Sequence, residues 1–144
     1  MVTRRDAREW ALQLLFQLDL NPQDPNEGFY ARFWEQIEAP PGERRFAEGL
    51  VAGVHENLAR IDETIQAVAE NWQLRRMAVV DRNVLRLAVY EMLMRTDIPP
   101  VVSINEAVDL AKYFSNAAAG RFVNGLLDRV RKDLHRPART ASGA

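Results

Sequence analysis

Residues 78–95 read AVVDRNVLRLAVYEMLMR, which is the most apolar segment of the chain. Hydrophobic side chains recur in it at spacings of three and four, and in a helix they would cover more than one face. A helix that is apolar on several faces is surrounded by other elements, so this segment is predicted to be a central helix. Thr96-Asp97-Ile98-Pro99-Pro100 ends it, because proline restricts the residue before it and has no N–H to donate.

The same spacing of three and four runs through the rest of the chain, and β-branched residues do not alternate with polar ones over any strand-like length. The sequence therefore predicts an all-α protein. About seven helices joined by short loops are expected to form two packed helical sub-bundles within one domain, residues 1–135. Residues 136–144, RPARTASGA, have no apolar periodicity and are predicted to be a disordered basic tail.

Capping signals place the starts of two helices. Thr3 and Asp6 form a capping box that predicts a helix over residues 4–20. The S-I-N-E sequence at 103–106 offers the same arrangement, with Ser103 as the cap and Glu106 reaching back. The other predicted elements are a short helix that includes residues 29–37, a helix from about 43 to a soft break at 60–62, a helix from there to 72, a connection at 73–76, a loop at 115–120 and a last helix over 121–134.

Two glycines lie four residues apart in the predicted helix that begins near residue 43. Gly49 and Gly53 present a small-residue face to which another helix can come close. In a chain without a membrane segment, this face is predicted to be a packing feature.

The composition is that of an ordinary globular domain, with 144 residues, 47% hydrophobic and 27% charged. The absence of cysteine excludes disulfides, thiolate nucleophiles and zinc–thiolate sites. The N-terminal MVTRRDAREW is charged where a signal peptide needs an apolar run, and no uncharged stretch approaches the roughly 18 residues that span a bilayer. We therefore expect a cytoplasmic protein with no membrane partner.

Charge is distributed unevenly along the chain. The net charge of −1, from 19 Lys and Arg against 20 Asp and Glu, by itself argues against a nucleic-acid partner. Residues 17–70 carry −7, however, whereas residues 1–16 carry +1 and residues 71–144 carry +5. Seventeen of the basic residues are arginine, which suits phosphate contacts and stacking on bases, although a GC-rich genome produces the same bias.

Catalytic groups are sparse. His55 and His135 are far apart in the sequence, and neither has a partner at metal-ligand spacing. The three serines, at positions 103, 115 and 142, stand in no nucleophile motif, and no glycine-rich phosphate loop is present. The sequence predicts a protein that is not an enzyme and that uses no metal or cofactor.

Arginine and aromatic side chains supply the candidate binding residues. Arg4 and Arg8 lie four residues apart on the first predicted helix, with Arg5 beside them, near backbone N–H groups that favour anions. Phe16 falls off the apolar stripe of that helix, and Arg121-Phe122 pairs a cation with an aromatic at the start of the last one. Two interpretations stay open from the residues alone: solvated charges with satellite core packing, or an arginine-rich surface for single-stranded RNA.

Four longer segments form a joint pattern: R-R-D-A-R-E at 4–9, V-L-R-L-A-V-Y-E-M at 84–92, I-P-P-V-V-S-I-N-E-A-V-D-L-A-K at 98–112 and R-F-V-N-G-L-L-D at 121–128. In order and spacing this pattern resembles the NusB family of bacterial transcription antitermination factors. The resemblance extends over residues 3–134, and its last two segments are the most specific.

The resemblance implies an all-helical fold of two halves and binding of the boxA element of ribosomal RNA leader transcripts. It implies as partners the ribosomal small-subunit protein that doubles as NusE, and the transcription elongation complex with other Nus factors. The family's RNA contacts map onto Arg4, Arg5, Arg8, Phe16, Arg121 and Phe122. Its surface for NusE maps onto Asp81, with Arg82 beside it.

Three sites depart from the family pattern. Phe16 stands where tyrosine is frequent, so stacking is kept while a hydroxyl contact is lost. Asp6 stands where arginine is common, and Ala117-Ala118 where polar or acidic residues are frequent. These differences predict weaker boxA affinity or a greater dependence on the partner protein.

Three alternatives compete with an RNA-binding factor. One is a helical protein–protein adaptor, and another is a self-associating NusB-like protein whose homodimer covers the arginines. The third is the NusB-like RNA-binding domain that precedes a ribosomal RNA methyltransferase domain, which would require a truncated chain.

Overall fold

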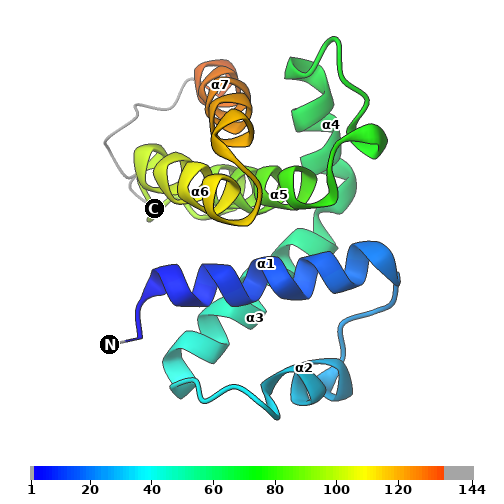
Figure 1. The fold of residues 1–144 in the computed structure, drawn as a ribbon, viewed down its shortest axis with the longest axis vertical. Coiled ribbons are helices and arrows are strands. Elements are labelled where there is room, and N and C mark those ends of the chain that lie inside the picture. Colours follow the sequence, from blue (N-terminus) through cyan, green and yellow to red (C-terminus); the bar gives the residue numbers. More distant parts are fainter. Residues whose placement is uncertain (1, 135–144) are drawn as a thin grey trace.

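The computed structural model describes residues 2–134, which form helices and connections and no strand. Figure 1 shows two halves, with α1–α3 below α4–α7. The elements are α1 (Arg4–Leu20), α2 (Glu27–Trp34), α3 (Pro41–Glu56), α4 (Leu58–Val68), the 3-10 turn η1 (Leu74–Arg76), α5 (Val79–Met94), α6 (Pro100–Phe114) and α7 (Ala117–Asp133). The prediction of an all-α fold in two sub-bundles is confirmed. The predicted tail, residues 136–144, lies outside the described residues.

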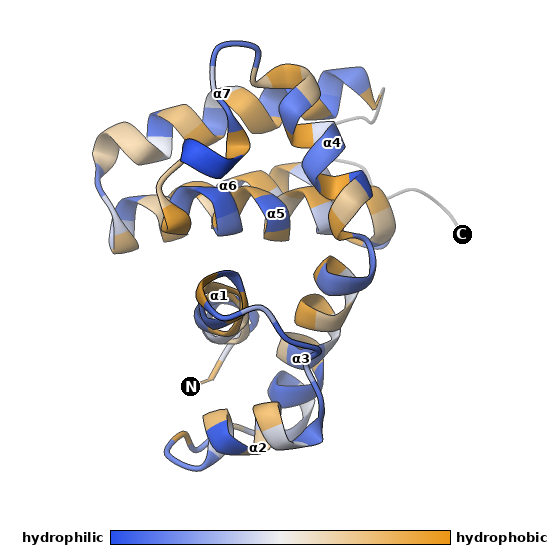
Figure 2. Ribbon diagram, turned by 90° about the vertical axis from the view of Figure 1, so that its right-hand side faces the viewer, coloured by the Kyte–Doolittle hydropathy of each residue, from blue (hydrophilic) through white to orange (hydrophobic). Residues whose placement is uncertain are grey.

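α5 is the central helix, as its sequence predicts. It packs against α1, α3, α4, α6 and α7, and so touches both halves of the molecule. In the turned view of Figure 2, α1 is seen end-on beneath α5 and α6. The apolar side chains of α5 that are buried on its several faces are Val84, Leu85, Leu87, Ala88, Val89 and Met92.

One of the two predicted capping boxes is present. The Thr3 N–H donates to Asp6 Oδ2 at 2.7 Å, the Asp6 N–H donates to Thr3 Oγ1 at 3.4 Å, and α1 begins at the next residue, Arg4. The second prediction is wrong, because α6 begins at Pro100, where a missing N–H costs nothing. Ser103 therefore lies inside the helix and is buried.

Two other predicted boundaries are also wrong. The break between α3 and α4 falls at Asn57, whose side-chain Nδ2 donates to the Gly53 carbonyl at 2.8 Å, and not at residues 60–62. α7 begins at Ala117, four residues earlier than predicted, because Asn116 accepts a hydrogen bond from the Ala119 N–H at 2.8 Å and caps the helix. Most of the predicted loop at 115–120 is thus helical, as its alanines favour.

The two glycines of α3 lie in different surroundings. A Cβ at Gly53 would overlap the ring of Tyr90 on α5, so glycine is what lets α3 and α5 come this close. A Cβ at Gly49 would meet nothing within 4 Å, and Gly49 is exposed. The predicted close approach is confirmed for Gly53 and is wrong for Gly49.

These glycines form a matched test of the packing. We expect Gly53→Ala to lower the free energy of unfolding by about 1–3 kcal/mol through overpacking against Tyr90. We expect Gly49→Ala to raise it by about 0.5–1 kcal/mol, since alanine is the better helix former. Urea denaturation followed by circular dichroism measures both, and equal effects of the two substitutions would contradict the close approach.

Candidate nucleic-acid interface

Arg8, predicted as an exposed RNA contact, lies in the core. The residue is 5% exposed, and its guanidinium donates to both oxygens of Glu91 on α5, at 2.8 and 2.9 Å. Ser103 on α6 donates to the same carboxylate at 2.9 Å. The prediction that Arg8 belongs to an exposed arginine surface is therefore wrong.

The position of Arg8 has a simple geometric reason. Residues three, four and seven positions further along α1, namely Ala11, Leu12 and Leu15, are all buried, and Arg8 shares their face. The sequence contained a signal for this, because Glu91 stands in the most apolar segment of the chain. A buried carboxylate needs a cationic partner.

Arg4 and Arg5 are exposed, with side chains 57% and 52% accessible, but both have carboxylate partners. Arg4 pairs with Glu43 at 2.9 Å, and its guanidinium lies 4.1 Å from the centre of the Phe46 ring. Arg5 pairs with Glu106 at 2.9 Å and with Asp109 at 2.6 Å. Surface pairs of this kind are weak in water, so a phosphate group can exchange with the carboxylates at low cost.

Phe16 is partly exposed and lies on the same face of α1 as Arg5. Eleven residues separate them, which is close to three full turns, so the two side chains point in nearly the same direction about 16 Å apart along the axis. α1 therefore aligns an exposed cation and a partly exposed aromatic ring along one side of the helix.

Arg121 and Phe122 lie in the second turn of α7 and not at its start. Arg121 is exposed, while Phe122 is half-buried and meets the ring of Trp72 edge-on, with 5.6 Å between ring centres. Trp72 is 57% exposed and lies beyond the end of α4 at Val68, whereas the sequence predicts a helix that continues as far as Trp72. Its long-range contact with Phe122 has no local sequence signal.

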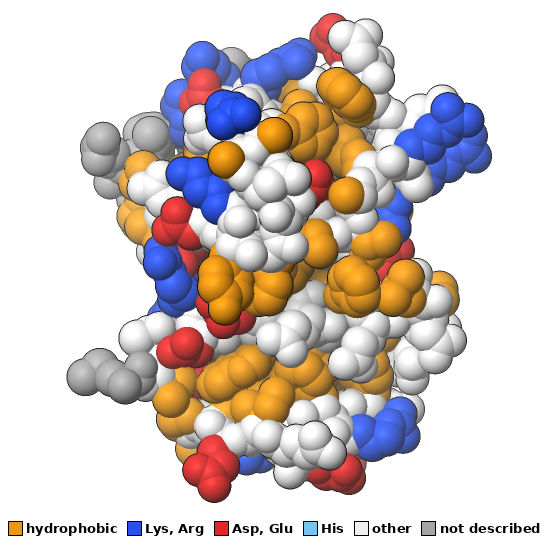
Figure 3. Space-filling model, viewed as in Figure 1, with side chains coloured by type: hydrophobic (Ala, Val, Ile, Leu, Met, Phe, Trp, Pro, Cys, Tyr) orange, Lys and Arg blue, Asp and Glu red, His pale blue; other side chains and the backbone are white. Residues whose placement is uncertain are grey.

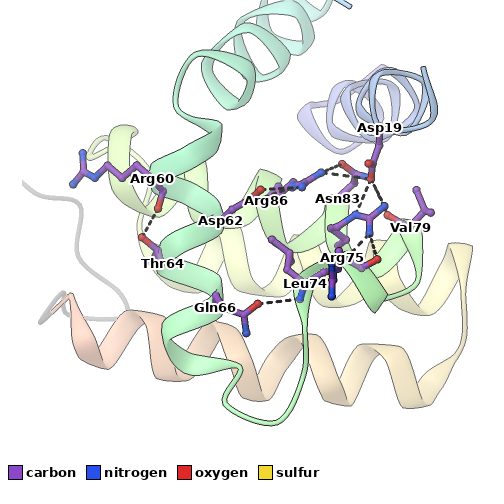
Figure 4. A network of polar contacts seen from close by, with 11 residues as sticks. Asp19, Arg60, Asp62, Thr64, Gln66, Leu74, Arg75, Val79, Asn83 and Arg86 are labelled. Atoms are coloured by element: carbon purple, nitrogen blue, oxygen red, sulfur yellow. Dashed lines mark hydrogen bonds and ion pairs between the residues drawn. The ribbon is translucent and has the colours of Figure 1, made fainter. Parts of the chain in front are cut away.

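The two predicted partner-binding residues, Asp81 and Arg82, differ in whether their polar atoms are already bound within the protein. Arg82 is largely enclosed: its Nε donates to Asp19 Oδ2 at 2.8 Å, and its Nη1 donates to the carbonyls of Leu74 and Arg75 at 3.3 and 3.0 Å. These contacts tie α5 to α1 and to η1, and Figure 4 labels the acceptor residues Asp19, Leu74 and Arg75. Arg82 therefore holds the fold together, and its guanidinium has little capacity left for a partner.

Asp81, in the first turn of α5, keeps free hydrogen-bonding capacity. Its Oδ1 is shielded from solvent and has no hydrogen-bond partner within the described part of the chain. Burial raises the pKa of this carboxyl group. Asp81 is partly exposed as a residue, although Oδ1 itself is shielded.

The charged surface is mixed. On the face seen in Figure 1, Figure 3 shows acidic and basic side chains interspersed, and no single continuous basic area.

Within residues 2–134, no three His, Cys, Asp or Glu side chains are grouped so that they could hold a metal ion. The helices in the same range include none that is both long and apolar enough to cross a bilayer.

Comparisons with known proteins agree on one family. The family model described as NusB family matches residues 5–132. The transcription antitermination protein NusB of Anaeromyxobacter dehalogenans (strain 2CP-1 / ATCC BAA-258) is 50% identical over 143 residues, covering 96% of this chain and 97% of that protein.

Two solved structures share the fold. T. maritima NusB superposes with a TM-score of 0.82 at 38% identity, covering 94% of both chains. A chain from a crystal structure of antitermination factors NusB and NusE in complex with dsRNA gives a TM-score of 0.81 at 30% identity, covering 90% of this chain and 96% of that chain. Fold and relatives together define an all-helical transcription antitermination factor, which is not an enzyme. The chain belongs to the NusB family.

Removal of Arg8 tests its structural role. Arg8→Ala leaves Glu91 buried without a cation, so we expect a loss of about 3–5 kcal/mol in the free energy of unfolding. The matched control, Arg4→Ala, breaks an exposed pair and is expected to cost less than about 1 kcal/mol. Urea titration of both variants at neutral pH measures the difference, and a loss below about 1 kcal/mol for Arg8→Ala would contradict the core assignment.

Proposed function

We propose that this protein binds boxA-type single-stranded RNA of ribosomal RNA leaders together with NusE, and so promotes processive transcription of ribosomal RNA. The observation that carries the proposal is the line formed by Arg5 and Phe16 on α1, with Arg4 beside it. The similarity to a NusB chain crystallised with NusE and RNA supports the same function.

The exposed residues divide the work of binding. Arg4 and Arg5 supply phosphate contacts, whose contribution to affinity falls as salt rises. Phe16 and Phe122 offer aromatic faces to unstacked bases, which favours single strands over duplex. Arg121 adds a cation on α7. In this proposal Arg8 has no RNA contact, because its guanidinium is bound to Glu91 in the core.

A domain with so few contacts binds RNA weakly alone, so a partner that extends the surface along the same strand raises the affinity. Asp81 is the proposed contact for NusE, because it lies partly exposed in the first turn of α5. Arg82 takes part by fixing α5 against α1 and η1. Other Nus factors and the cytoplasm, where nascent ribosomal RNA is made, complete the proposed setting.

Titration of labelled boxA RNA tests the function directly. We expect binding that weakens with salt and strengthens when NusE is added, because the phosphate contacts are electrostatic and the partner extends the surface. A scrambled RNA of equal length is the control, and equal affinity for both RNAs with and without NusE would contradict the proposal. Size-exclusion chromatography at two protein concentrations shows whether the protein forms a homodimer, which is the alternative in which the arginines are covered.

A double substitution tests the arginines of α1. Arg4→Ala with Arg5→Ala removes two phosphate contacts, so the slope of log K against log salt concentration is expected to fall in magnitude by about 1.4 for a single strand. The free energy of unfolding should change little, since both ion pairs are exposed. Arg32→Ala on α2 is the control, because Arg32 is an exposed arginine that is not among the proposed contacts. An unchanged salt slope would exclude Arg4 and Arg5 from the interface.

A further inference from the structure

We propose that Trp72 is a stacking platform for an unpaired RNA base, with Arg75, Arg76 and Arg121 as its cationic surroundings. This group, together with Phe122, is called the Trp72 patch below. The inference rests on the proposed RNA-binding function and adds a contact that lies on the other half of the molecule from α1.

Trp72 differs from the other two tryptophans. Trp10 and Trp34 pack edge-on against each other with 5.5 Å between ring centres, and Trp34 is only 7% exposed. Trp72 keeps 57% of its surface in solvent, although a tryptophan gains more from burial than almost any other residue. Every base has a π-face, so an open indole can receive one.

The loop holds Trp72 in place before any ligand binds. The Gln66 side chain donates to the carbonyls of Ala69 and Trp72, at 3.1 and 2.7 Å, and accepts from the Leu74 N–H at 3.0 Å. Figure 4 shows the bond from Leu74, whose side chain is buried. With Phe122 against the ring as well, little conformational entropy is left to lose on binding.

The arginines of the Trp72 patch are free, unlike those of α1. Arg75, Arg76 and Arg121 are exposed, and none forms an ion pair with a residue in 2–134; Arg75 donates only to the neutral Gln73 side chain, at 3.2 Å. Glu70, the acid nearest to Trp72 in the sequence, is paired with Arg129 at 3.2 Å. Asp19 and Asp62, which line a hollow with Arg75, are paired with Arg82 and Arg86. An incoming phosphate therefore displaces no carboxylate here.

Charge separates this patch from the other exposed aromatic pair. Tyr113 and Phe114 also contact each other edge-on, and Tyr113 is 76% exposed. Tyr113, however, lines a hollow in which the acids Glu9 and Asp109 balance the cations Arg5 and Lys112, and Arg5 is paired with Asp109. An aromatic platform beside unpaired arginines is the combination that recognises single-stranded nucleic acid, so RNA is the occupant to which the Trp72 patch is suited.

Fluorescence of the intact protein on titration with boxA-type RNA tests the proposal. Stacking of a base on Trp72 is expected to quench the emission of the wild-type protein, and Trp72→Phe should abolish that quenching while keeping most of the affinity. Trp72→Ala is expected to weaken binding about fivefold to 150-fold. Thermal melts followed by circular dichroism confirm that both variants fold, and the phenylalanine variant keeps a ring against Phe122.

The arginines are tested in the same assay. Arg75→Ala with Arg76→Ala should lower the salt slope by about 1.4, while the control Arg32→Ala leaves it unchanged. Wild-type affinity in Trp72→Ala, or RNA binding with no change in Trp72 emission, would overturn this proposal and leave the function of α1 intact. If the wild-type protein binds no RNA at low salt, with or without NusE, the proposed function and this inference both fail.

Discussion

The buried contact of Arg8 with Glu91 is the interaction on which the rest of the structure depends. It joins α1 to α5, and Ser103 on α6 completes the hydrogen bonding of the carboxylate. Because two charges are costly to remove from water, the pair is stable only when all three helices are in register. It therefore fixes how the half that contains α1 sits on the half that contains α5 and α6.

Three groups of arginines explain how a chain of net charge −1 can offer local cationic contacts. Arg8, Arg82 and Arg86 hold helices together through Glu91, Asp19 and Asp62. Arg4 and Arg5 are exposed but paired, and the arginines of the Trp72 patch are exposed and unpaired in the described chain. A mixed surface without a large positive field also discriminates against bulk nucleic acid, which binds mainly through charge.

Features set by local physics were predictable from the sequence. The Thr3–Asp6 capping box placed the start of α1, and the all-round apolar pattern identified α5 as the central helix. The S-I-N-E sequence misled because Ser103 and Glu106 bond to Glu91 and Arg5, which are distant in sequence. Local patterns cannot distinguish a capping serine from one that satisfies a buried carboxylate.

The candidate site was predicted in part for the same reason. The exposure of Arg4, Arg5 and Arg121 agrees with their expected roles, which stay predictions. The burial of Arg8 and the enclosure of Arg82 depend on partners from other helices, and so does the contact of Trp72 with Phe122. Helical periodicity shows which residues share a face but not which tertiary partner meets that face.

The separation of Arg8 and Glu91 by 83 positions has a consequence for folding on the ribosome. α1 is synthesised first, yet its arginine has no buried partner until α5 has emerged. Until then its guanidinium stays in water, so the docking of α1 against α5 must wait for the synthesis of α5. The docking of α1 is thus a late, long-range step, of the kind that slows the folding of helical proteins otherwise rich in local contacts.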